Sequence, residues 1–230
     1  MLINDLKYYC EKKNYYKKTS GLDHPNRSRQ TIDNWHEYPI QDFDYQFNSW
    51  GFRGLDYKQY IGQKVNICLG DSFTVNVGGP IEHSWCSQLA EHFDIPTLNL
   101  GMDGAGNDAI KLVYDRACEI FDVKNTFVMY SFLHRRLNKN LEFVQDVNDM
   151  YDNFEYFVKQ RIPTIFESAL PHWCWTTAEC SFLKYNKIFY YHNKQDADLQ
   201  TNRDGHHMNK ETNKIYADYF YNQWKQKNES

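Results

Sequence analysis

The sequence of 230 residues lacks the features that mark several specialised classes of protein. No apolar run approaches the roughly 18 to 20 residues of a membrane-spanning helix, so no membrane span is expected. There is no basic excess: the net charge is −4, whereas nucleic-acid-binding proteins usually carry positive charge that contacts phosphates. No nucleic-acid partner is therefore expected. The first residues also lack the apolar core of a secretory signal, which favours a cytoplasmic location.

Paired cysteines are absent too. The six cysteines are irregularly spaced and include no CxxC pair, which favours reduced thiols in a reducing compartment. Three of them lie in apolar runs and are expected to be small core residues: Cys68, Cys86 and Cys118. A zinc site at His172, Cys174 and Cys180 is the alternative, but the paired ligand spacing of such sites is missing. No metal or other cofactor is expected.

The sequence does contain enough apolar material for one core. Hydrophobic residues make up 41% and aromatic residues 17%, and a chain of this length buries most of its apolar surface without disulfides. Residues 1–60 are polar and irregular, whereas apolar runs begin near residue 65. The expected organisation is an N-terminal arm, 1–60, that packs on a single domain, 61–230.

Short apolar runs alternate with segments of helical periodicity from residue 65 onwards. Strands are predicted over 65–70, 96–101, 126–132 and 164–169. Helices are predicted over 82–93, 107–121, 141–161 and 210–227, with Asn107 or Asp108 as the N-cap of the second. The alternation predicts an α/β fold with a mostly parallel sheet. Ligands of such sheets bind beyond the carboxyl ends of the strands, so the residues that follow each strand are the candidates.

One serine and one histidine in these positions suit nucleophilic catalysis. Ser72 directly follows the first predicted strand, and a serine becomes a strong nucleophile only when a base removes its proton. His207 precedes the last helix, with Asp204 three residues before it to orient the ring. The neighbouring His206 is expected to point away. Backbone N–H groups in the glycine-rich loop 101–106 could stabilise a developing oxyanion.

These residues resemble the SGNH (GDSL) hydrolases. GDSFT at 70–74 is similar to the first sequence block of that family, NLGMDG at 99–104 to the second, and DGHH at 204–207 to the last. NSWGFRG at 48–54 is similar to a segment that precedes the first block in one branch. The resemblance spans roughly residues 48–220. It implies a three-layer α/β/α sandwich of flavodoxin-like type, and oxyanion donors at the N–H groups of Ser72 and Gly104.

The third block of the family departs from the pattern. The family usually has Gly-x-Asn-Asp after the third strand, where the asparagine donates to the oxyanion, but residues 129–136 read MYSFLHRR. Asn107 and Ser131 are the two candidates for the missing donor. Arg135 is either a contact for a polar or anionic substrate group or part of a solvated rim. Loss of one donor typically slows such an enzyme about a hundred- to a thousandfold.

The predicted function is a serine hydrolase that cleaves an acyl ester through an acyl-enzyme. The resemblance implies a small-molecule or glycan substrate, such as a short-chain ester or a carbohydrate O-acetyl group. Two alternatives stay open. An O-acyltransferase would pass the acyl group to a glycan hydroxyl, and a non-catalytic binding module would use a degenerate hydrolase scaffold. The missing asparagine and the high aromatic content motivate the binding module.

Overall fold

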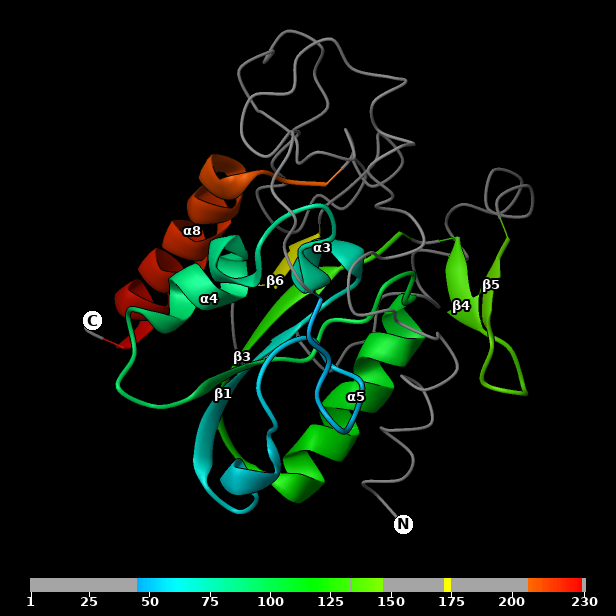
Figure 1. Ribbon diagram of the computed structural model, residues 1–230, viewed down its shortest axis with the longest axis horizontal. Coiled ribbons are helices and arrows are strands. Elements are labelled where there is room, and N and C mark those ends of the chain that lie inside the picture. Colours follow the sequence, from blue (N-terminus) through cyan, green and yellow to red (C-terminus); the bar gives the residue numbers. More distant parts are fainter. Residues whose placement is uncertain (1–44, 133, 147–171, 175–206, 229–230) are drawn as a thin grey trace, which may run out of the picture.

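The fold is built on a parallel sheet. The computed structural model describes residues 45–132, 134–146, 172–174 and 207–228 (Figure 1). Four strands pair in the order β2-β1-β3-β6, and every pairing is parallel. They are β1 (Lys64–Leu69), β2 (Thr97–Asn99), β3 (Asp122–Tyr130) and β6 (His172–Cys174). The predicted α/β fold with a parallel central sheet is confirmed.

Helices cover both faces of this sheet (Figure 1). Helix α5 (Asn107–Ile120) packs against β1 and β3 on one face. On the other face α4 (Trp85–Ala90) and α8 (Lys210–Asn228) lie side by side. Short turns of helix complete the described part: η1 (Lys58–Tyr60), α3 (Ser72–Val75) and η2 (Ile81–His83). The result is the three-layer α/β/α arrangement that the sequence predicts.

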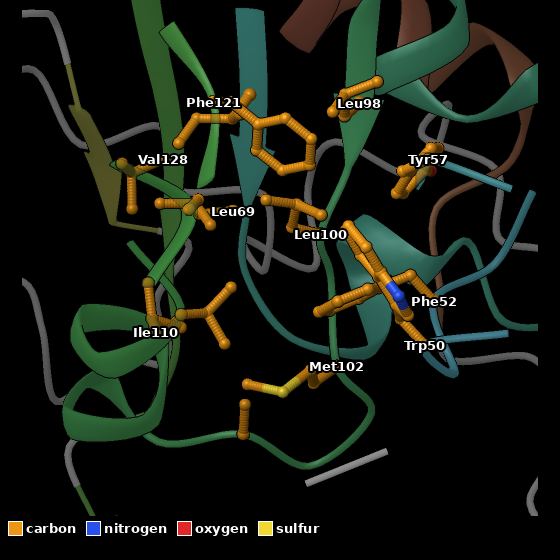
Figure 2. Packing of buried hydrophobic residues seen from close by; sticks show 14 of the residues in the cluster. Trp50, Phe52, Tyr57, Leu69, Leu98, Leu100, Met102, Ile110, Phe121 and Val128 are labelled. Atoms are coloured by element: carbon orange, nitrogen blue, oxygen red, sulfur yellow. The ribbon is translucent and has the colours of Figure 1, made fainter. Parts of the chain in front are cut away.

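Each central strand sends alternate side chains to the two helical layers. Val65, Ile67 and Leu69 of β1 lie in the same apolar cluster as Ile110 of α5 (Figure 2). Cys68, between them in sequence, belongs to a second cluster that includes residues of α4 and α8. Strands buried on both faces therefore appear in the sequence as continuous apolar runs rather than as alternating ones.

The segment just before β1 is part of the core. Trp50, Phe52 and Tyr57 are buried in the α5-side cluster, beside Leu98 and Leu100 (Figure 2). This segment belongs to the arm predicted over 1–60, and its described part, residues 45–60, fills the core as well as packing on it. Residues 1–44 of the arm lie outside the described residues.

The helix predicted over 141–161 is wrong at its start. Phe143–Gln145 form strand β5, which pairs in antiparallel fashion with β4 (Arg135–Leu137). The side chain of Asn138 accepts a hydrogen bond from the N–H of Glu142, and Leu141 has a φ of 61°, so the chain turns where the helix was expected. Two later predictions, the rest of that helix from residue 147 and the strand over 164–169, lie outside the described residues.

The cysteines in the described residues match the prediction only in part. Cys68 and Cys86 are buried free thiols, as expected, but Cys118 is exposed on α5 and is not a core residue. The described residues contain no group of three or more His, Cys, Asp or Glu side chains that could hold a metal ion. Within the same residues, no helix is both long enough and apolar enough to cross a membrane.

Candidate active site

Ser72 lies at the carboxyl end of β1, where it is the first residue of α3. The turn that leads into it requires glycine at position 70, because a Cβ there would come within 2.0 Å of the Thr74 hydroxyl and 2.9 Å of the Met129 carbonyl oxygen. Ser72 itself is 2% exposed. Within the described residues no hydrogen bond engages its Oγ or its N–H.

Asp71 caps the short helix that begins with Ser72. Its Oδ1 accepts a hydrogen bond from the N–H of Phe73 at 3.1 Å. Its Oδ2 accepts from the hydroxyl of Ser131 and from Nη1 of Arg135, both at 2.8 Å. The carboxylate is 2% exposed and therefore depends on these three partners for its charge to be tolerated. Asp71 thus ties the loop that carries Ser72 to Ser131 and Arg135.

His207 lies beside the turn that carries Ser72, residues 70–76, although it is distant in the sequence. Its imidazole is buried, and its ring centroid is 4.6 Å from that of Phe73, the residue that follows Ser72. The next segment begins α8, where the side chain of Asn209 caps the N–H of Thr212. Asp204 and His206 lie outside the described residues. The orienting acid therefore stays a prediction.

Asn213 fixes the start of α8 against the turn that carries Ser72. Its Nδ2 donates to Oδ1 of Asn76, just after α3, and to the carbonyl of Met208. Its Oδ1 accepts from the N–H of Trp85 at the start of α4. One buried amide thus joins α8, α4 and the residue that follows α3. Nothing in the sequence indicates this role of Asn213, because an asparagine within a helix has no distinguishing pattern.

The loop after β2 is tied to the same turn. Asn99 donates from Nδ2 to the carbonyl of Thr74 at 2.7 Å and accepts from the N–H of Gly101. Gly104 has a φ of 72° and is half-buried, and its N–H takes part in no hydrogen bond within the described residues. A backbone donor is thus available on the loop where the resemblance implies one. Its role as an oxyanion donor stays a prediction.

Asn107 and Ser131, the two candidates for a third oxyanion donor, bind each other. Nδ2 of Asn107 donates to the carbonyl of Ser131 at 3.0 Å, and its Oδ1 accepts from the N–H of Ser131 at 2.8 Å. The single hydrogen of the Ser131 hydroxyl goes to Asp71, whereas Asn107 keeps a second hydrogen on Nδ2. The N-cap prediction is wrong: Gly106 occupies the N-cap position of α5, and Asn107 and Asp108 lie within the helix. The Asp108 side chain accepts from the N–H groups of Ala109 and Leu137.

Arg53 holds the opposite end of α3. Its Nη1 donates to the carbonyls of Val75 and Asn76 at 3.0 and 2.6 Å, and its Nη2 donates to that of Gly79 at 2.9 Å. The guanidinium lies 4.2 Å over the ring of Tyr45 and is buried. The resemblance at 48–54 marked this segment, but nothing in the sequence singled out the arginine.

Comparison with known proteins gives only distant likenesses. No family model matches the sequence, and no curated protein matches it. A crystal structure of the psychrotrophic esterase EstA from Pseudoalteromonas sp. is similar at 18% identity, with a TM-score of 0.43 over 72% of this chain and 99% of that one. A G-D-S-L family protein from Desulfitobacterium hafniense DCB-2 is similar at 14% identity, with a TM-score of 0.37 over 67% and 96%.

Proposed function

We propose that this protein is a serine hydrolase of the SGNH type that cleaves an acyl ester. The supporting observation is that the His207 ring lies 4.6 Å from that of Phe73, the residue after Ser72, beyond the carboxyl end of β1. Nucleophile and base are expected at this edge of a parallel sheet. The Gly104 N–H on the neighbouring loop supplies the third element of such a site.

The reaction follows from these groups. Ser72 Oγ attacks the acyl carbon while His207 takes its proton, and the carbonyl oxygen becomes an oxyanion that the N–H groups of Ser72 and Gly104 stabilise. The intermediate collapses as His207 returns the proton to the departing alcohol, which leaves an acyl group on Ser72. Water then attacks this ester with His207 again acting as base, and the acid is released. Asp204 would steady the imidazolium through both steps.

The substrate class comes from the resemblance rather than from the site. Short-chain esters and O-acetyl groups on carbohydrates are the first to screen. An O-acyltransferase would form the same acyl-enzyme and differ only in the acceptor, a sugar hydroxyl in place of water. Hydrolysis products measured with and without added oligosaccharide would separate the two reactions.

The test of the nucleophile needs no knowledge of the substrate. Intact mass is measured after incubation with a small fluorophosphonate, which bonds covalently to an activated serine. The wild-type protein should gain one adduct and Ser72→Ala none, while Ser49→Ala, which alters an exposed serine, should label like the wild type. His207→Ala should label more slowly by about a thousandfold or more, since base and nucleophile act as a unit.

Two results would contradict the proposal. A folded wild-type protein that gains no adduct would favour a non-catalytic binding module. An adduct that persists in Ser72→Ala would place the reactive residue elsewhere. Circular dichroism of each variant shows whether the protein is folded.

A further inference from the structure

The turn that carries Ser72 is held by the ion pair between Asp71 and Arg135, neither of which takes part in the proposed reaction. Arg135 Nη1 lies 2.8 Å from Oδ2 of Asp71, and the two side chains are 14% and 2% exposed. The same Nη1 lies 3.3 Å from the hydroxyl of Ser131, which also donates to Asp71. Breaking such a buried pair on one side leaves an uncompensated charge, so the two residues depend on each other.

Three strand-end loops meet in this network. Asp71 follows β1, Asn107 follows the β2 loop, and Ser131 with Arg135 follows β3. Asn107 joins the network through its two hydrogen bonds with the Ser131 backbone. Because Asp71 directly precedes Ser72 and fixes the N–H of Phe73 after it, a shift of its carboxylate would move the nucleophile.

Arg135 is itself held in a fixed position. Its guanidinium lies 4.4 Å over the ring of Phe132. Its backbone carbonyl passes so close to Gly106 that a Cβ there would be 2.4 Å away. The N–H of Leu137, two residues further on, donates to Asp108 Oδ2 at 2.6 Å. The start of β4 thus packs closely against the start of α5, and these contacts fix the backbone from which Arg135 reaches Asp71.

We propose that Arg135 is a positioning residue for Ser72, acting through the carboxylate of Asp71 rather than on the substrate. This inference rests on the proposed function. The charge of Arg135 is already paired with that of Asp71, which argues against a role in attracting an anionic substrate group. In this chain the contacts of Arg135, Ser131 and Asn107 unite the three strand-end loops beside Ser72, in the region where the resembling family carries its third-block asparagine.

The experiment compares the rate of fluorophosphonate labelling in Arg135→Gln and Arg136→Gln. Arg136 is the matched control: it is the next residue of β4, and it pairs with Asp146 of the hairpin instead of with Asp71. Arg135→Gln should label more slowly by about ten- to a hundredfold, because small displacements of a reacting group cost that much. Arg136→Gln should keep the wild-type rate. Labelling is measured well below the melting temperature of each variant, so that only the folded protein is compared.

A rescue variant separates positioning from a simple loss of stability. In Arg135→Gln with Asp71→Asn, two neutral side chains replace the ion pair and leave no unpaired charge. This double variant should recover part of the lost labelling rate, whereas Asp71→Asn alone should not. Arg135→Lys should fall between wild type and Arg135→Gln, because it keeps the charge without the planar guanidinium.

Kinetics with p-nitrophenyl acetate give the second readout. Loss of positioning lowers kcat and leaves KM nearly unchanged. Wild-type labelling and kcat in Arg135→Gln would overturn the inference and leave the proposed hydrolase intact. So would a rise in KM restricted to anionic esters, which would show that Arg135 binds substrate. A wild-type protein that does not label at all would overturn both.

Discussion

The two ends of α3 are each held by an arginine, but in different ways. At the end away from Ser72, Arg53 is 1% exposed and donates to main-chain carbonyls that the short helix leaves without intrahelical partners. At the end that carries Ser72, Arg135 is 14% exposed and acts through the carboxylate of Asp71. One arginine binds the backbone directly, and the other binds a side chain that binds the backbone.

This difference predicts a division of roles. Within the described residues, removing Arg53 leaves the carbonyls of Val75 and Gly79 without a donor, whereas that of Asn76 keeps the Gly79 N–H. Buried polar groups without partners are costly. Removing Arg135 leaves the buried Asp71 carboxylate with two of its three hydrogen bonds. We therefore expect Arg53 to matter most for stability and Arg135 most for the reactivity of Ser72.

The largest effect is expected from Arg53→Met. The loss of its hydrogen bonds to Val75, Asn76 and Gly79 should lower the free energy of unfolding by about 3 to 5 kcal/mol. Urea denaturation followed by circular dichroism measures this loss. Arg116→Met is the matched control, because Arg116 forms a surface ion pair with Glu119 that should contribute about 0.5 kcal/mol or less.

The same variant tests the division of roles. Folded Arg53→Met should lose less of its fluorophosphonate labelling rate than Arg135→Gln does. If instead Arg53→Met labels more slowly than Arg135→Gln, both ends of α3 position the nucleophile, and the contrast between them is wrong.

A smaller effect is expected from Gly106→Ala. The new Cβ would meet the Arg135 carbonyl at 2.4 Å, so β4 must move, and overpacking of this kind typically costs about 1 to 3 kcal/mol. The displacement should also carry Arg135 away from Asp71 and slow labelling, although no side chain of the site is altered.

Gly62→Ala provides the comparison for that variant. Gly62 has a φ of 71° and open space around it, so the alanine adds backbone strain without displacing any neighbour. It should lower the melting temperature and leave the labelling rate unchanged. Equal labelling rates in the two glycine variants would show that the position of β4 does not affect the reactivity of Ser72.

Local patterns in the sequence predicted much of the fold. The apolar run at 65–69 indicated a buried strand, and the periodicity at 107–121 and 210–227 indicated helices that the structure contains. The same apolar run placed Ser72 just beyond the carboxyl end of the first strand, where the structure has it. These features depend on neighbouring residues, which is why a single sequence reveals them.

Features that depend on distant partners were missed. The β4–β5 hairpin lacks an alternating apolar pattern, and its turn depends on hydrogen bonds that the Asn138 side chain accepts from the N–H groups of Asn140 and Glu142. The partner of Arg135 lies on another loop, and the acceptors of Arg53 are carbonyls, which every residue carries. The sequence around Asn107 is typical of a helix cap, but its amide pairs with the Ser131 backbone, a contact that no local pattern encodes.

The smallest effect is expected from Tyr57→Phe, which tests the hydrogen bonds that the Tyr57 hydroxyl makes with the backbone of Arg53 and Asn99. The Tyr57 hydroxyl lies 3.2 Å from the carbonyl oxygen of Arg53 and 3.1 Å from that of Asn99, and it accepts from the Asn99 N–H. Its loss leaves that N–H without its acceptor, so the variant should lose about 1 to 2 kcal/mol at neutral pH.

The pH dependence of unfolding identifies this contribution. Burial raises the pKa of Tyr57 far above its ordinary value of 10.0, so the folded protein keeps the phenol protonated. Below pH 10 the phenol is protonated in both states and its contribution is fully present. Above pH 10 the unfolded chain ionises first, so stability falls by about 1.4 kcal/mol per pH unit from this group. Urea midpoints between pH 9 and 11 should therefore fall less steeply in Tyr57→Phe than in the wild type. Tyr60→Phe controls for the loss of a tyrosine from the same segment, and parallel slopes in wild type and Tyr57→Phe would show that solvent reaches the hydroxyl.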